Sequence, residues 1–452
     1  MSPTTVETKP VAMSHAWLHL WAVTAAFGTY FCMYMYRKPF TAAAFKSDGW
    51  IDWDQKAVLV AAQVIGYMIS KVIGIRVVSE VTRAQRAGLL MALILVSHAA
   101  LLLFAIVPAP WHIACIFLNG LPLGIVFGLV LGFLEGRRMT EALTAGLCAS
   151  FILAGGVSKT VGQRILQFTQ SQWGWDLSQS ERWMPFLAGA LFLIPITFFV
   201  YMLSQIPPPN EHDELARSKR EPMRSEDRWR ILNTYAVGLG AIAIVYLFVS
   251  IMRSLRDDFA PEILAGLGAE VQANDYATID FWVALVVMVV NGASVFIRDN
   301  RIALQSALAV CALGFTITLL AIGLRTFASV SPQMMMVYIG AGLYLPYVAV
   351  HTTIFERMIA WTRDRANVGF LMYVADSLGY FGYVVIMILK TFTPKSISGH
   401  PGTMVQIFFG ICVVSAIASL FLIAVASVSF HRRQEREDMT AGEPIPSDRA
   451  PA

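Results

Sequence analysis

Residues 56–107 read KAVLVAAQVIGYMISKVIGIRVVSEVTRAQRAGLLMALILVSHAALLLFAIV, and this stretch decides the fold. It holds two apolar runs, 56–79 and 86–107, separated by a short basic segment. A helix that crosses a bilayer needs about 20 mostly apolar residues, and both runs meet that length. Runs of this kind recur along the whole chain. The sequence therefore predicts an all-α membrane protein with many spans.

The overall composition supports this prediction. Of the 452 residues, 56% are hydrophobic and only 14% are charged, whereas soluble domains carry about 25% charged residues. A soluble protein of this length would have too little polar surface to cover itself, so the apolar excess must face lipid. The net charge of +4 indicates nothing about nucleic acid, and none is expected as a partner. All five cysteines lie inside apolar runs, so we expect no disulfide, no metal site and no cofactor.

Twelve predicted spans fall into two sets of six, which gives a two-bundle design. The N-terminal bundle (15–205) holds predicted spans at 15–40, 56–79, 86–107, 111–134, 141–166 and 183–205. The C-terminal bundle (231–430) holds predicted spans at 231–256, 274–297, 301–327, 331–358, 367–390 and 402–430. A tail (1–14), a charged linker (206–230) and a second tail (431–452), expected to be disordered, complete the chain.

Basic residues alternate between the two sides of the predicted bundle. Arginine and lysine gather in every second connection, at 76–86, 137–138, 217–230, 298–301, 357–365 and 432–436. Loops rich in lysine and arginine stay on the cytoplasmic side. We therefore expect both termini and the linker to be cytoplasmic, and the protein to lie in the cytoplasmic (inner) membrane, which is a plasma membrane.

Ionisable and polar residues inside the predicted spans point to a site. A charge at membrane depth costs roughly 2.5–3.5 kcal/mol on insertion scales, so it normally faces a cavity or a partner. The residues on such polar stripes that we expect to bind substrate are Arg37, Lys71, Arg253, Tyr34, Tyr67, Tyr246 and Tyr380. The residues that we expect to serve in ion coupling are Asp376, His351 and Lys159. The set is net basic, which favours an anionic solute.

The two arginines occupy matching positions. Arg37 lies near the outer end of the first span and Arg253 near the outer end of the seventh, with Pro39 and Pro261 following. Their guanidinium groups are expected at similar depth, one from each bundle, where they can bind one anion from both sides.

Each residue also has a purely structural interpretation. Arg37 can extend to the membrane interface, Arg253 can pair with Asp257 or Asp258, and Lys159 can be a simple ion-pair residue. Asp376 can be a counter-ion for a lysine, and His351 and the tyrosines can be packing residues. Glycines at 120, 124, 128 and 132 recur every four residues, which predicts close packing against a neighbouring helix.

Several motifs resemble those of the major facilitator superfamily, and most closely its organophosphate:phosphate antiporters. Tyr34-Met-Tyr-Arg37-Lys38-Pro-Phe40 is similar to the first-span motif of these antiporters, whose Arg contacts the substrate phosphate. Gly66-Tyr67-Met-Ile-Ser70-Lys71 is similar to their second-span motif, whose Lys lies in the translocation path. Arg253, followed by Asp258 and Pro261, resembles their seventh-span pattern with the second phosphate ligand.

The chain also departs from that branch. A substrate-side histidine of the fifth span is replaced by apolar residues near Phe151, and a fourth-span glutamine by Leu123. Asp376 has no counterpart in the pattern. The resemblance therefore implies that the anion-binding arginines are kept while the groups that select the organic part of the substrate differ.

These observations predict a function as a transporter, not an enzyme. We expect a secondary active transporter, an antiporter by resemblance, that moves a small anionic solute such as phosphate or an organophosphate by alternating access. The resemblance implies a monomer. Two alternatives stay open: a proton-coupled symporter that uses Asp376, and a transporter-like receptor that binds an anion without flux.

Overall fold

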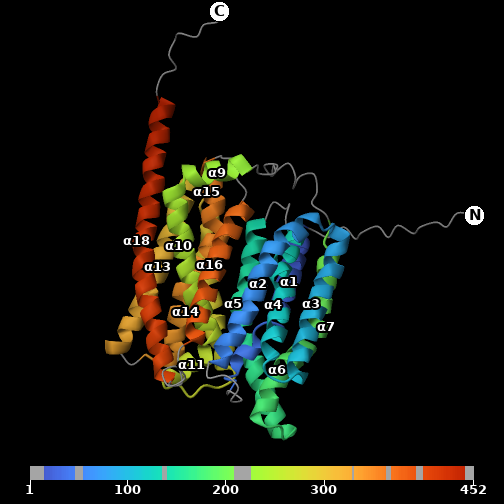
Figure 1. Cartoon of the computed structure of the whole chain (residues 1–452). Helices are drawn as coiled ribbons and strands as arrows, with labels where there is room; N and C mark the ends of the chain where they lie inside the picture. The colour runs from blue at the N-terminus through green and yellow to red at the C-terminus, as the bar shows by residue number, and fades with distance from the viewer. Residues whose placement is uncertain are drawn as a thin grey trace, which may run out of the picture.

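The structure is a computed structural model, and its described residues are 15–45, 54–134, 140–207, 225–327, 330–362, 368–392 and 401–442. Within these ranges every regular element is a helix. The helices run nearly parallel and form two bundles that lie side by side (Figure 1).

The first bundle contains the helices up to residue 204. They are α1 (His15–Tyr34), η1 (Pro39–Ala42), α2 (Gln55–Glu80), α3 (Arg83–Ile106), α4 (His112–Leu134), α5 (Thr140–Gln172), α6 (Leu177–Leu191) and α7 (Leu193–Ser204).

The second bundle contains the helices from residue 225 onward. They are α9 (Ser225–Thr234), α10 (Ala236–Asp258), α11 (Ala260–Gly266), α12 (Asp275–Gly292), η2 (Ala293–Phe296), α13 (Asn300–Phe327), α14 (Pro332–Ala349), η3 (Val350–Ile354), α15 (Phe355–Thr362), α16 (Val368–Thr391) and α18 (Pro401–Gly442).

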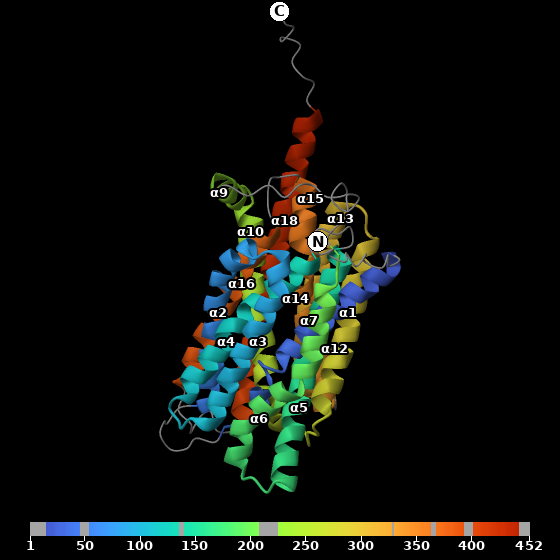
Figure 2. The same cartoon turned by 90° about the vertical axis from the view of Figure 1, so that its right-hand side faces the viewer.

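The helices are long enough to cross a membrane. Ten helical segments of the described residues have the length and hydropathy of a span, and α1 and α5 lie alongside them (Figure 2). The chain is therefore a multi-pass membrane protein, as the sequence predicts. One end of the bundle carries α9 and α15 and is called the α9 end; the opposite end carries α11 and is called the α11 end. Helix α1 begins and α18 ends at the α9 end, as expected for an even number of crossings.

Prolines explain where several predicted spans are interrupted. The first span, predicted over 15–40, is helical only to Tyr34 and resumes as η1 at Pro39, because Pro39 has no N–H for the carbonyl of Met35. The sixth span breaks at Phe192 into α6 and α7, since Pro195 has no N–H for the carbonyl of Leu191. The tenth span contains Pro346 and widens into the π-helix η3.

Two helices extend into segments that the sequence assigns to the linker and the tail. Helix α9 occupies the last part of the predicted linker, from Ser225. The expectation of disorder from His431 is wrong as far as Gly442, because α18 continues to that residue. The sequence HRRQEREDM at 431–439 consists mostly of good helix formers, and these extend the helix beyond its apolar part.

Two glycines of the predicted stripe, Gly120 and Gly124, pack against α2, while Gly132 packs against Arg86 of α3. A Cβ added at Gly120 would lie 2.2 Å from the carbonyl oxygen of Gln63, and one at Gly124 would lie 2.5 Å from that of Tyr67. The contact is reciprocal, since a Cβ at Gly66 would lie 2.4 Å from the carbonyl oxygen of Phe117. Helices α2 and α4 therefore touch through their backbones. This close contact fixes the position of the α2 residues that face the centre of the protein.

Candidate functional site

Arg37 lies in the turn that follows α1 and is only 5% exposed. Its guanidinium carbon lies 3.9 Å from the ring centre of Tyr67 on α2 and 5.9 Å from that of Tyr34. Its carbonyl oxygen accepts a hydrogen bond of 2.9 Å from Nε2 of Gln63, which fixes the turn against α2. In the described part of the chain this guanidinium has no carboxylate partner, and its Nε is buried without a hydrogen bond. The side chain is buried, so it does not extend to the membrane interface.

Arg253 occupies the corresponding place in the second bundle, on α10, and is 7% exposed. Its guanidinium carbon lies 4.4 Å from the ring centre of Tyr347 and 5.7 Å from that of Tyr344. The guanidinium donates one long hydrogen bond, 3.3 Å, to Oγ of Ser254. Among the residues that the structure describes, it too lacks a carboxylate partner. The alternative that Arg253 pairs with Asp257 or Asp258 is therefore wrong.

The two guanidinium groups share neighbours. Tyr34 and Tyr380 each interact electrostatically with both Arg37 and Arg253, although these residues come from four different helices or turns. Two cations from opposite bundles thus face the same small region. The hydroxyl groups of Ser70 on α2 and Ser250 on α10 are buried without a hydrogen-bond partner in the described structure, but they lie against Gly124 and Gly379 of neighbouring helices. The region between the two guanidinium groups offers positive charge, and we call it the arginine site.

A second group of residues lies beside the arginine site. Lys71 on α2 forms an ion pair with Asp376 on α16, which joins the two bundles at mid-depth. The hydroxyl of Tyr246 donates a hydrogen bond to the same carboxylate. Nε2 of His351 lies 3.5 Å from Oδ1 of Asp376, the oxygen that accepts from Tyr246, while Lys71 pairs with Oδ2. Nζ of Lys71 also lies 4.7 Å from the ring centre of Tyr380. Asp376 therefore has the counter-ion role that the sequence left open.

Lys159 lies elsewhere, toward the α11 end. It forms an ion pair with Asp257 and donates a 3.0 Å hydrogen bond to the carbonyl of Gly155. Nζ of Lys38 lies 3.1 Å from Asp257 and also pairs with Asp258. Both lysines belong to the first bundle and both carboxylates to the second. Lys159 is therefore an ion-pair residue in this structure and is not grouped with Asp376 and His351.

Further polar contacts join the two bundles at the α11 end. Lys56 pairs with Glu262 at 2.6 Å, and Lys390 pairs with Asp54. Oγ1 of Thr160 donates a 2.7 Å hydrogen bond to the carbonyl oxygen of Ala273. The described contacts between the bundles thus hold them together at the α11 end and at mid-depth.

Sequence reasoning singles out the arginines and sets Tyr344 and Tyr347 on one polar stripe with His351, but it does not assign these two tyrosines to Arg253. The guanidinium of Arg253 lies over the ring of Tyr347, and this ring stacks on that of Tyr246 with ring centres 5.5 Å apart. The carbonyl oxygen of Tyr347 accepts a hydrogen bond of 3.0 Å from Nδ1 of His351. The position of Tyr347 one turn before His351 on the same helix is the signal that marks it. The buried pair between Arg256 and Asp280, 3.0 Å apart, had no such signal. No group of three or more His, Cys, Asp or Glu in the described ranges can hold a metal ion.

A sequence comparison matches the chain to one family. The family model described as "Family of unknown function (DUF5690)" matches residues 39–433. No curated protein matches the chain by sequence.

Solved structures of transporters share the fold. The bacterial homologue of the human lysosomal transporter Spinster, inward-facing and unoccupied, matches with a TM-score of 0.62 and 11% identity, over 96% of this chain and 100% of that one. The D-xylose–proton symporter matches with a TM-score of 0.61 and 13% identity, over 90% of this chain and 97% of that one. A bacterial homologue of the human drug peptide transporters PepT1 and PepT2 matches with a TM-score of 0.59 and 13% identity, over 94% of this chain and 100% of that one. These likenesses confirm the predicted twelve-helix major facilitator fold.

Proposed function

The chain belongs to a family of unknown function (DUF5690), and we propose that it is a secondary active transporter that carries a small anionic solute by alternating access. The solute would bind at the arginine site, between the two bundles. Rocking of one bundle against the other would expose that site to each side in turn.

The observation that carries the proposal is the pair of buried guanidinium groups without carboxylate partners in the described structure. A buried charge without a partner is destabilising by several kcal/mol. The tyrosine rings beside Arg37 and Arg253 offset part of this, about 0.5–2 kcal/mol for each cation–π contact. An anion between the two guanidinium groups would offset the rest. The site is thus stabilised by the ligand that we propose for it.

The neighbouring charges set the number of free cations. Lys71 is neutralised by Asp376, and Lys38 and Lys159 by Asp257 and Asp258. Arg37 and Arg253 keep their full charge, so the site offers two positive charges to a solute. Guanidinium groups present paired donors that match phosphate or carboxylate oxygens. A phosphate-bearing solute, inorganic phosphate or an organophosphate, fits best.

The resemblance to the organophosphate:phosphate antiporters supports exchange as the mode of transport, and the surrounding residues favour a different organic group. Phe151, in the place of a polar residue of those antiporters, packs its ring 5.6 Å from that of Tyr347. This apolar contact borders the platform of Arg253. From the basic loops we infer that both termini lie in the cytoplasm and that the protein lies in the inner membrane. From the resemblance we infer that its unit is a monomer.

The test is exchange of inorganic phosphate in proteoliposomes made with the full-length protein. Arg37→Ala and Arg253→Ala should each lower exchange more than tenfold, because truncating one partner of a buried charge pair costs about 2–5 kcal/mol. Arg37→Lys keeps the charge and should retain part of the activity. Arg325→Ala removes an exposed arginine with its own aromatic contact, 5.6 Å from Phe409, and should leave exchange unchanged. A folded wild type that neither binds nor exchanges phosphate would refute the phosphate assignment.

The group around Asp376 supports a second candidate, proton-coupled symport of an anion. The carboxylate contacts a lysine, a tyrosine and a histidine, which are groups able to accept or donate a proton. If a proton on Asp376 drives transport, Asp376→Asn abolishes uptake driven by a pH gradient and leaves exchange intact. Equal uptake by this variant and the wild type would exclude the candidate. A receptor would instead show tight anion binding without any flux.

A further inference from the structure

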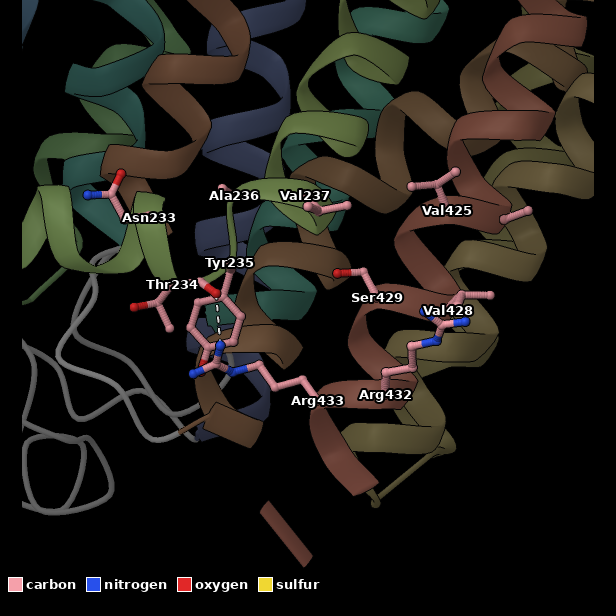
Figure 3. Close-up of a pocket in the computed structure, with 11 residues that line it drawn as sticks. Asn233, Thr234, Tyr235, Ala236, Val237, Val425, Val428, Ser429, Arg432 and Arg433 are labelled. Atoms are coloured by element: carbon pink, nitrogen blue, oxygen red, sulfur yellow. Dashed lines mark hydrogen bonds between the residues drawn. The ribbon is translucent and has the colours of Figure 1, made fainter. Parts of the chain in front are cut away.

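A groove opens at the α9 end, far from the arginine site, between the α9–α10 junction and α18 (Figure 3). Its volume is about 850 Å³, and eleven residues line it. Two of them are the arginines Arg432 and Arg433, and none is a carboxylate. The groove therefore combines positive charge with walls that are largely apolar.

A break between two helices builds one wall. Helix α9 ends at Thr234, and Tyr235 adopts a non-helical conformation before α10 begins at Ala236. The last carbonyl groups of a helix lack partners within it. Here Nη1 of Arg433 donates a 2.8 Å hydrogen bond to the carbonyl oxygen of Thr234, and the guanidinium carbon lies 4.4 Å from the ring centre of Tyr235. The break thus holds Arg433 across the groove, as Figure 3 shows.

The neighbouring arginine is differently placed. Arg432 is exposed and makes no hydrogen bond or ion pair within the described part of the chain. Both arginines lie at the end of the apolar part of α18, where the helix passes from lipid to water. At that depth an arginine faces the headgroup region of a bilayer. Arg432 is therefore available to a negatively charged headgroup, beside an arginine that is already fixed.

Apolar stripes lead from the groove along both helices. On α18, Val428, Phe421 and Val414 are exposed at seven-residue steps and lie on nearly one face. On α10, Val237 in the groove and Ile244 are exposed at the same spacing. Acyl chains placed along these stripes would have their headgroup at the arginines.

We propose that this groove binds an anionic phospholipid of the surrounding bilayer. The phosphate would contact Arg432, beside the positive charge of Arg433 and with Ser429 as a further donor, and the acyl chains would follow α10 and α18. Basic pockets between transmembrane helices are suited to such headgroups. The alternative is that the two arginines only extend to the membrane–water interface. That role would require neither the helix break at Tyr235 nor the groove. The inference does not depend on the proposed transport activity.

The test is native mass spectrometry of the purified full-length protein, after delipidation and addition of phosphatidylglycerol or phosphatidylcholine in equal amounts. The wild type should retain phosphatidylglycerol in preference. Arg432→Ala should lower that preference about fivefold, the effect expected for one basic residue near the membrane surface. Ala424→Trp fills the groove from an exposed position, keeps both arginines, and should abolish retention. Arg325→Ala, an exposed arginine on α13, serves as the matched control and should retain the lipid.

Three results would overturn the proposal. They are equal retention of the two lipids by the wild type, an unchanged preference in Arg432→Ala together with Ala424→Trp, and an equal loss in Arg325→Ala. The thermal unfolding of each variant without lipid gives a check on folding. A lipid site also predicts that added phosphatidylglycerol raises the unfolding temperature of the wild type and not that of Ala424→Trp.

Discussion

Replacing Gly120 with alanine should separate the effect of backbone contact from that of helix propensity. The new Cβ would lie 2.2 Å from the carbonyl oxygen of Gln63, and distances below 3.0 Å are essentially never seen for a Cβ. Because that oxygen belongs to the backbone of α2, it cannot turn aside. Helices α2 and α4 would have to move apart by about 1 Å, which we expect to cost about 1–3 kcal/mol.

A matched control is available in the same protein. A Cβ added at Gly410, on α18, meets nothing within 4 Å. Gly410→Ala should therefore stabilise the protein by about 0.4–1 kcal/mol, because alanine reduces the freedom of the unfolded chain. The same gain applies at Gly120, so the net loss there is about 0–2.5 kcal/mol, and the two variants differ by the packing cost alone, about 1–3 kcal/mol.

The assay is denaturant or thermal unfolding of both full-length variants in one detergent. Gly120→Ala should unfold more easily than the wild type, and Gly410→Ala less easily. Gly120→Ala should also weaken phosphate exchange, because Gln63 anchors the carbonyl of Arg37. If Gly120→Ala were as stable as Gly410→Ala, the close contact between α2 and α4 would be refuted.

Two further predictions concern the residues beside the arginines. Lys71→Met and Asp376→Leu should each lower the free energy of unfolding by about 3–5 kcal/mol, because each leaves a buried charge without its partner. The double variant should be about as stable as the wild type, since a buried ion pair can be replaced by apolar residues. Additive losses in a double-mutant unfolding cycle would contradict this pairing. Tyr347→Phe should keep the affinity for the anion, because the ring and not the hydroxyl faces Arg253. Tyr347→Leu removes the ring and should lower that affinity about 2–30-fold. Equal affinities of the two variants in a binding titration would count against the aromatic platform.

The sequence predicts the architecture well, because membrane spans depend on composition and length. The spans of α2, α3 and α4 begin and end within three residues of the predicted limits. Interruptions were harder to foresee. A proline permits a kink without requiring one, and Pro195 breaks a span while Pro122 lies within an unbroken α4.

The site was predictable where the signal is local. A buried arginine in an apolar run is rare, so Arg37 and Arg253 could be singled out from the sequence alone. Pairing was not predictable, because it depends on contacts between bundles. Asp257 lies one turn from Arg253 along the chain, yet it pairs with Lys159, 98 positions away. Helical spacing shows which residues share a face of one helix. It does not show which cation of another helix forms an ion pair with them.

That choice of partner has a thermodynamic consequence. Asp257 is within electrostatic range of Arg253 and is held by Lys38 and Lys159 of the opposite bundle. If the bundles parted at the α11 end, both lysines would withdraw and leave a carboxylate beside the guanidinium. That carboxylate would compete with a bound anion for Arg253, so affinity for the anion would fall on opening. By reciprocity, a bound anion would favour the closed α11 end by the same free energy. Opening of the α11 end and release of the anion would then be thermodynamically coupled through Asp257.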